Sequence, residues 1–216
     1  MSEKVDVKIL EQGDIFFFFR PKVSATEIKS IDDVRRFYMV LCPEDEQKII
    51  DETNNDTNPK EKKIYRLFII GKKSLPEIRK TEARSSERFW AQVGGIFYDS
   101  QNLVDDFTAD EYKKGDAARP VGEGKYAIIE HQSHAELAFI LEIPQEIGEA
   151  QKELGIQKEA SYIITVINPY KPVSEGYTTA EADRPKYPED IQKYLNKTDG
   201  KFIPLSQNLT LINYQN

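Results

Sequence analysis

The chain has 216 residues, of which 39% are hydrophobic and 31% are charged; its 30 Lys and Arg residues against 37 Asp and Glu residues leave a formal net charge of −7. This composition excludes a collagen-like, coiled-coil or fully disordered chain. The acidic balance also argues against a protein whose main task is to bind nucleic acid, because that affinity comes from Lys and Arg side chains that neutralise phosphates. The length predicts a single domain over residues 1–216, or two closely packed halves over 1–115 and 125–216.

Cysteine content and the N-terminus bear on the cellular compartment. Cys42 is the one cysteine, so the chain forms no intramolecular disulfide and no cysteine-rich zinc site. Residues 1–6 lack the basic and then apolar pattern of a secretory signal. The longest apolar runs are far shorter than the roughly 20 residues that span a bilayer. We therefore expect a cytoplasmic protein with no membrane partner.

Three apolar runs in the N-terminal half predict strands that are buried on both faces. A half-exposed antiparallel strand would alternate apolar with polar residues, and these runs do not; Arg66 is their one charged residue. Glycine, aspartate or proline lies next to each run, as expected at strand ends. The predicted strands are residues 15–19, 37–42 and 64–70.

The segments around these strands are more polar. Residues 44–63 are rich in turn-forming residues, which predicts a mobile excursion at the edge of the protein. A further strand pair is predicted within residues 89–98, where Gly94 and Gly95 mark a turn or a bulge. Residues 116–124, with one proline and two glycines near their end, predict a connector between the two halves.

One helix is predicted between this strand pair and the connector. Leu103, Val104 and Phe107 have the spacing of one helical face, and Thr108 begins a capping-box pattern for a last turn. We expect this helical segment to end at Gly115.

The C-terminal half predicts an antiparallel hairpin, two short helices and two more strands. In the second hairpin strand, Leu137 and Phe139 share one face, and Glu136 and Glu142 share the other. The predicted strands are residues 125–130, 137–143, 161–167 and 209–212, and the two helices end at Gly155 and Gly200. The whole chain is therefore predicted to be a mainly antiparallel, β-rich α+β fold with eight or nine strands and three or four short helices.

The densest group of ionisable side chains lies at the turn of the predicted hairpin. His131 and His134 are the only two histidines, and Glu130 and Glu136 flank them. Imidazole and carboxylate groups bind zinc, iron or manganese, so His131, His134 and Glu136 form a candidate site for a divalent metal. His134 alone could also serve in acid–base chemistry. A solvated hairpin explains the same residues, because zinc-hydrolase motifs lie on helices and no further ligand is identifiable.

A second candidate site combines arginines with an aromatic side chain. Such a surface could bind phosphate, an acidic peptide or single-stranded nucleic acid. Glutamates are interleaved with these arginines, as on an ordinary solvated face. A solvated face that binds no ligand is therefore the alternative interpretation of this segment. The candidate ligand-binding residues are Arg20, Arg79, Arg84, Arg88 and Trp90.

Several catalytic or nucleotide-binding motifs are absent from the sequence. A Walker A loop that includes Gly71 and Lys72 would need glycine at 66 and serine or threonine at 73, where the chain has Arg66 and Lys73. Residues 122–124 lack the third glycine of a dinucleotide-binding turn. No G-x-S-x-G pattern occurs. Cys42 closes an apolar strand before Pro43, which predicts a buried, unreactive thiol.

Five segments spread over most of the chain resemble a family of uncharacterised bacterial and archaeal cytoplasmic proteins. They are Gly13–Val23 (GDIFFFFRPKV), Arg36–Leu41 (RFYMVL), Ala118–Tyr126 (ARPVGEGKY), Glu159–Tyr162 (EASY) and Ile167–Pro169 (INP). The resemblance implies no particular activity, cofactor or catalytic residue.

The sequence leaves three functions open. We expect first a non-enzymatic soluble protein that works by binding, and that can form a homo-oligomer because exposed strand edges pair with other strands. The first alternative is a metal-assisted hydrolase that uses residues 130–136. The second is a protein that binds nucleotide or nucleic acid through the arginine and aromatic surface. No cofactor is expected apart from the divalent metal of the first alternative.

Overall fold

A computed structural model describes residues 8–22, 28–44, 47–51, 56–76, 90–108, 117–131, 134–171, 187–205 and 211–212; for residues 47–51 and 56–62 we describe the backbone alone. The strands are β1 (Lys8–Pro21), β2 (Val34–Pro43), β3 (Gln47–Asp51), β4 (Asp56–Lys62), β5 (Tyr65–Ile70), β6 (Ala91–Phe97), β7 (Arg119–His131), β8 (His134–Ile143), β9 (Glu159–Ile167) and β10 (Phe202–Pro204). The helices are η1 (Ile31–Asp33), α1 (Ser100–Thr108), α2 (Glu149–Glu153) and α3 (Glu189–Lys197). The predicted mainly antiparallel, β-rich α+β fold is confirmed.

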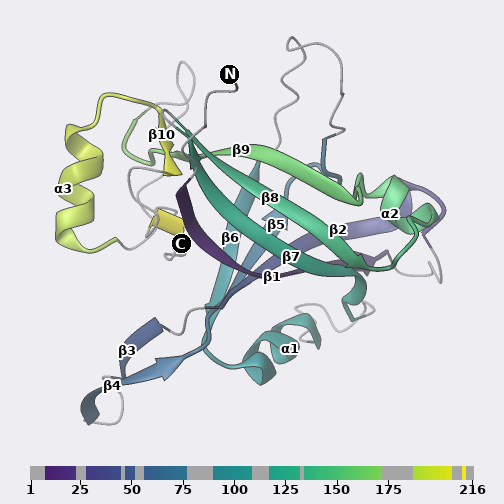
Figure 1. Ribbon diagram of the computed structural model, residues 1–216, viewed down its shortest axis with the longest axis horizontal. Coiled ribbons are helices and arrows are strands. Elements are labelled where there is room, and N and C mark those ends of the chain that lie inside the picture. Colours follow the sequence, from purple (N-terminus) through teal and green to yellow (C-terminus); the bar gives the residue numbers. More distant parts are fainter. Residues whose placement is uncertain are drawn as a thin grey trace, which may run out of the picture.

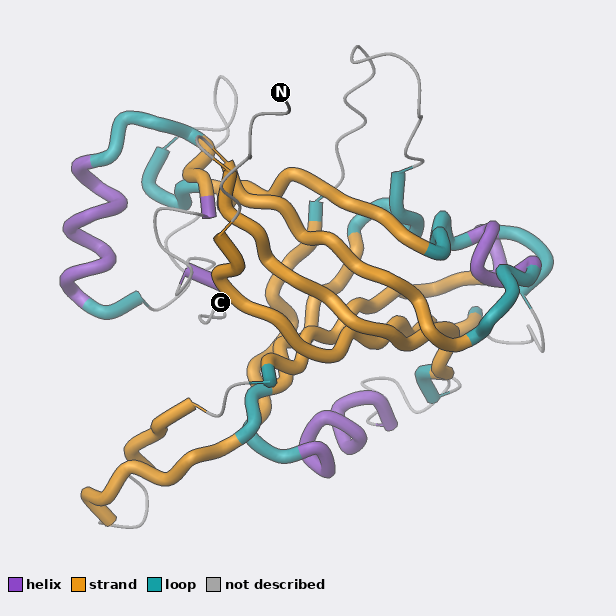
Figure 2. Tube along the Cα trace, in the orientation of Figure 1, coloured by secondary structure: helices purple, strands orange, loops and turns teal. Residues whose placement is uncertain are grey.

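Eight of the strands form one curled antiparallel sheet. Its order is β10-β9-β8-β7-β1-β2-β5-β6, and β3 and β4 form a separate hairpin. The sheet bends so that β9, β8, β7 and β1 pass in front of β2, β5 and β6 (Figure 1). Figure 2 shows α1 below the sheet in this view, with α2 and α3 at its two ends. Among the described residues, no helix has the length and apolar character needed to cross a bilayer.

Strand β1 is the centre of the sheet and is covered on both faces, as its phenylalanine run predicts. Ile15, Phe17 and Phe19 point into the curled sheet and are buried there. Phe16 and Phe18 point to the outer face, where they pack against a second apolar cluster. A strand with no polar residue on either parity is stable in water only with cover on both sides, and the fold provides that cover.

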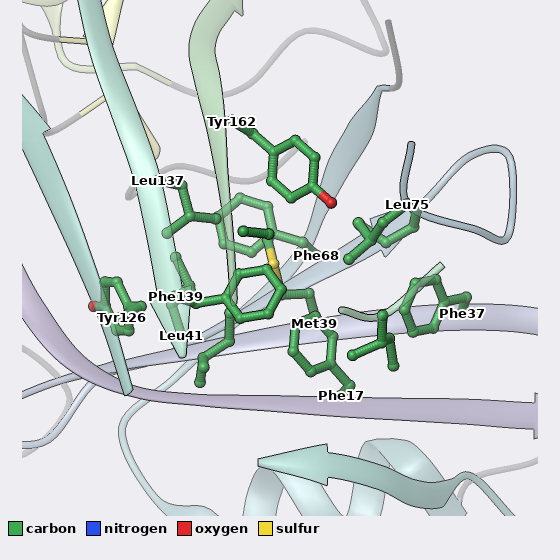
Figure 3. Packing of buried hydrophobic residues seen from close by; sticks show 14 of the residues in the cluster. Phe17, Phe37, Met39, Leu41, Phe68, Leu75, Tyr126, Leu137, Phe139 and Tyr162 are labelled. Carbon is green, nitrogen blue, oxygen red and sulfur yellow. The ribbon is translucent and has the colours of Figure 1, made fainter. Parts of the chain in front are cut away.

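The interior of the curled sheet is filled by large side chains from both walls (Figure 3). The ring of Phe17 on β1 lies 6.0 Å from that of Phe37 on β2 and 5.3 Å from that of Phe139 on β8. Burying one such side chain contributes about 1.5–3 kcal/mol. The interior is therefore a packed core that joins strands distant in the sequence.

Helix α1 covers the outer face of β1, β2 and β5. Leu103 and Phe107 are buried against Tyr38, Val40 and Leu67, as predicted. Val104, predicted on the same helical face, is instead exposed. The ring of Phe107 lies 4.6 Å from that of Phe18. Helix α1 ends at Thr108, and the predicted continuation to Gly115 lies outside the described residues.

Residues 119–124 are not a connector, contrary to the prediction, but the first part of β7. This strand pairs with β1 and β8, so the sheet runs without interruption from the N-terminal to the C-terminal strands. The pairings slip by one residue between Phe17 and Phe18 and between Glu123 and Gly124. The proline and glycines that resemble a linker are explained by these irregularities, since glycine in a strand marks bulges and close backbone approach.

Three further predictions need correction. Of the predicted strand pair at 89–98, the described residues 90–98 hold one strand, β6; Gly94 is its extra residue in the pairing with β5, so the predicted bulge is confirmed. The expected excursion at 44–63 contains the β3–β4 hairpin. Among the described residues the last strand is β10, and Leu211 and Ile212, predicted to be in a strand, are buried in a short 3-10 turn. An apolar run near a chain end satisfies burial in either conformation, so the pattern alone does not separate them.

Candidate functional site

Of the predicted arginine and aromatic residues, the structure describes Arg20 and Trp90, and these two differ in exposure. Arg79, Arg84 and Arg88 lie outside the described residues. Arg20 is only 8% exposed, and one of its terminal nitrogens, Nη2, donates a hydrogen bond of 2.9 Å to the carbonyl of Phe107. The structure therefore corrects the expectation for Arg20. The Arg20 guanidinium joins β1 to α1 at the carbonyl of Phe107, which also accepts a 3.3 Å hydrogen bond from the N–H of Ala118.

Trp90, by contrast, is exposed and held in place. Its side chain is 56% exposed, and its carbonyl accepts a 2.9 Å hydrogen bond from the N–H of Gly71 in the turn after β5. The indole ring lies directly on Gly71, because a Cβ atom at that position would overlap three ring atoms. Glycine at 71 thus provides the space in which one face of the ring rests on the backbone, and the rest of the ring meets solvent.

Strand β6 follows Trp90 and forms one edge of the sheet. In the described part of the chain it pairs with β5 alone. Residues 90–98 contain no charged side chain, and both Trp90 and Tyr98, which flank the strand, are exposed. We call Gly71 together with residues 90–98 the Trp90 surface.

The two lysines next to this surface differ in their hydrogen bonding. Lys72 is exposed beside Gly71. Lys73 has a left-handed backbone, with φ of 62°, and its Nζ donates a 2.7 Å hydrogen bond to the carbonyl of Val34. In the turn after β5, Lys72 is therefore exposed, whereas Lys73 is hydrogen-bonded to the first residue of β2.

His131, His134 and Glu136 come together on the outer face of β7 and β8, as the predicted hairpin requires. Nε2 of His134 lies 3.1 Å from Oε1 of Glu136, and Nε2 of His131 lies 3.9 Å from Oε2. Ser161 on β9 donates a 2.6 Å hydrogen bond to Oε2 of the same carboxylate. The hydrogen bond from Ser161 is the main reason that the pKa of Glu136 lies below its usual value; the hydrogen bond from His134 and the charges of both histidines act in the same direction, and partial burial opposes them.

The geometry of this cluster limits its chemistry. The two imidazole rings are stacked, 5.3 Å apart and 25° from parallel, and the Nε2 atoms of both lie within 3.9 Å of the Glu136 carboxylate. Within the described ranges, no three His, Cys, Asp or Glu side chains are placed to hold a metal ion. Ser161 gives its hydrogen to the carboxylate and not to an imidazole, which is not the Ser–His–acid order of a nucleophilic triad. The cluster is a polar patch on the outer face.

A buried ionic network was not predicted from the sequence. Arg66 on β5 binds Glu11 on β1 through two hydrogen bonds of 2.6 and 2.7 Å, and the hydroxyl of Tyr126 on β7 donates a 2.7 Å bond to the same carboxylate. Burial and the negative Glu11 raise the pKa of Tyr126 above its ordinary value. Arg66 is 1% exposed, so the network joins three strands inside the core. The one signal in the sequence that points to this network is Arg66, a charged residue within the apolar run 64–70.

Cys42 is buried, as its apolar strand predicts. Burial is also the main cause that raises the pKa of its thiol. A raised thiol pKa lowers the thiolate fraction at neutral pH, which agrees with an unreactive side chain.

Comparison of the chain with family models, with curated proteins and with solved structures finds no match in any of the three.

Proposed function

We propose that this chain is a non-enzymatic protein that works by binding another polypeptide, and that the Trp90 surface makes the contact. The observation that carries the proposal is the position of the Trp90 indole, which is more than half exposed yet rests on Gly71. Tryptophan is among the residues most enriched in the energetic centres of interfaces. A ring that is already held in place loses little conformational freedom when a partner covers it.

The rest of the Trp90 surface suits a polypeptide partner. Strand β6 has no charged residue that would have to be desolvated on contact. An edge strand also presents backbone donors and acceptors to an added strand, as in β-augmentation.

The test uses a displayed library of random linear peptides selected against the immobilised chain. Trp90→Ala should weaken the selected peptides by about tenfold or more, the loss typical of a hot-spot residue. Val104→Ala is the matched control, because Val104 is another exposed apolar side chain, on α1. Trp90 is the only tryptophan, so its fluorescence emission should also shift on binding. Selection of no peptide, or of peptides that bind Trp90→Ala unchanged, contradicts the proposal.

A second candidate function uses the same indole. Aromatic side chains stack on bases of single-stranded nucleic acid, and Lys72 is exposed next to Gly71. Binding of a single-stranded oligonucleotide that weakens steeply with salt and requires both Trp90 and Lys72 would support it. The net charge of −7 makes this function the weaker of the two.

The metal-assisted hydrolase remains a prediction from residues 130–136. Metal analysis of the purified protein and of His134→Ala tests it directly. Bound zinc, iron or manganese that is lost in His134→Ala would favour this function over polypeptide binding.

A further inference from the structure

We propose that the polypeptide that binds the Trp90 surface is a second copy of this chain, whose β6 pairs antiparallel with β6 about a two-fold axis and joins two eight-stranded sheets into one. The inference rests on the proposed function for the choice of surface and adds the identity of the partner. Its first basis is that β6 is the last strand of the sheet order in the described part of the chain, seven residues long and without proline or charge. Natural edge strands are usually protected by such residues, by being short or by bulges, and of these β6 has only the bulge at Gly94.

The charge distribution indicates where two copies of the chain can meet. Two molecules of net charge −7 repel each other, so a close contact between them is expected where charge is absent. Residues 90–98 form such a segment, and the next residue, Asp99, is charged. A symmetric contact presents this same neutral strand on both sides.

The sequence of the segment also fits two-fold pairing. Trp90 and Tyr98 lie four residues before and after Gly94, so an antiparallel register centred on Gly94 sets residue 90 of one copy opposite residue 98 of the other. Gly94 then lies on the axis, where the absence of a side chain permits close approach of the backbones. Gly94 is exposed and is the bulged residue of β6. In this register the two bulges lie opposite each other, so residues 91–93 of one copy pair with residues 95–97 of the other.

The contact would cover apolar surface that is now exposed. Trp90 is 56% exposed and Tyr98 45% exposed, and each lies at one end of the ladder. Two-stranded pairing gains backbone hydrogen bonds, and burial of these aromatic side chains adds to that gain. Association of this kind is expected to depend on protein concentration.

The experiment measures the molar mass of the full chain by light scattering over a wide range of concentrations, with hydrogen exchange of the β6 amides in parallel. The test variant is Ala91→Lys with Gln92→Lys, since both side chains are exposed on β6. The matched control is Gln101→Lys with Asn102→Lys, which adds the same charge at exposed positions of α1. We expect a monomer–dimer transition in the wild type and in the control. In the test variant the dimer should weaken by about tenfold or more.

Hydrogen exchange keeps the inference testable even if the test variant folds poorly, because it uses the wild type. The amides of residues 91–97 should exchange more slowly as the dimer forms. A monomer at every concentration, or a dimer that both double variants weaken equally, overturns the inference. A monomer that still selects peptides through Trp90 leaves the proposed function standing, whereas a β6 dimer that Trp90→Ala does not weaken contradicts only the role that the proposed function gives to Trp90.

Discussion

The two edges of the curled sheet are built differently. Strand β10 has three residues, ends at Pro204, and places the fully buried Ile203 against α3 and Leu211. Strand β6 has seven residues, no charge and no proline, and is flanked by exposed aromatic side chains. The first edge is short and covered by the chain's own apolar cluster; among the described residues, the second has no such cover. An edge that is protected only by a bulge can still pair with another strand, so this difference supports β6 as the proposed binding edge.

The largest expected effect comes from the core that lies between the two edges. Glu11→Ala removes the carboxylate that binds Arg66 and leaves the buried guanidinium without that partner, which should cost about 3–5 kcal/mol of unfolding free energy. Chemical denaturation measures this change. Asp14→Ala is the control, because the Asp14–Lys125 pair is exposed and such pairs contribute about 1 kcal/mol or less. Equal effects of the two variants would show that the buried network does not stabilise the core.

At the β10 edge, Ile203→Ala should lower the free energy of unfolding by about 2–4 kcal/mol, because it opens a cavity under α3. Dimer formation should be unchanged at temperatures where the variant is folded. Denaturation and light scattering measure the two quantities separately. A loss of dimer in the folded variant would mean that the contact lies at the β10 edge, which contradicts the proposed pairing through β6.

At the β6 edge, Gly71→Ala should displace the Trp90 ring, because the new Cβ overlaps it. We expect a change in tryptophan emission and quenching, with a stability loss of about 1 kcal/mol, which is near the centre of the distribution for single substitutions. Peptide binding should weaken as it does in Trp90→Ala. The control is Gly148→Ala, since a Cβ at Gly148 approaches only a side-chain oxygen of Gln151. Unchanged emission in Gly71→Ala would mean that the glycine does not position the ring.

The smallest effect is expected on the outer face, away from both edges. The pKa of Glu136 lies below its ordinary value of 4.5 in the folded protein, so its carboxylate stabilises the fold above pH 4.5, and this stabilisation is lost as the pH falls through the lower folded pKa. Ser161→Ala removes the main cause of the lowering. Its cost at pH 7 should be about 1 kcal/mol or less and should vanish in strong acid.

Denaturation of both proteins at several pH values measures this difference. A cost of Ser161→Ala that does not change with pH would mean that the hydroxyl packs in the sheet without stabilising the charged carboxylate. Dimer formation should be the same in both proteins, because Ser161 lies on β9 and not at the β6 edge.

Much of this fold is predictable from local pattern. The apolar runs at 15–19, 37–42 and 64–70 each form a strand, because a continuous apolar segment must be covered on both faces. The spacing of Leu103 and Phe107 predicts α1, since a helix buries one face. The hairpin of β7 and β8 brings His131, His134 and Glu136 together, as sequence neighbours across a tight turn must be.

Other features depend on contacts between residues far apart in the chain. Arg20 and Arg66 both lie in strands. Only the tertiary structure shows that Arg20 donates a hydrogen bond to the carbonyl of Phe107 on α1, and that Arg66 binds Glu11 in the core. The same holds for Trp90, whose position depends on Gly71 in a neighbouring turn. Local periodicity determines which segments are strands, because burial of each face is a local requirement. Strand order, and with it the strand that forms the edge in the described part of the chain, is decided by tertiary packing, because pairing energy is gained only between segments that the fold brings together.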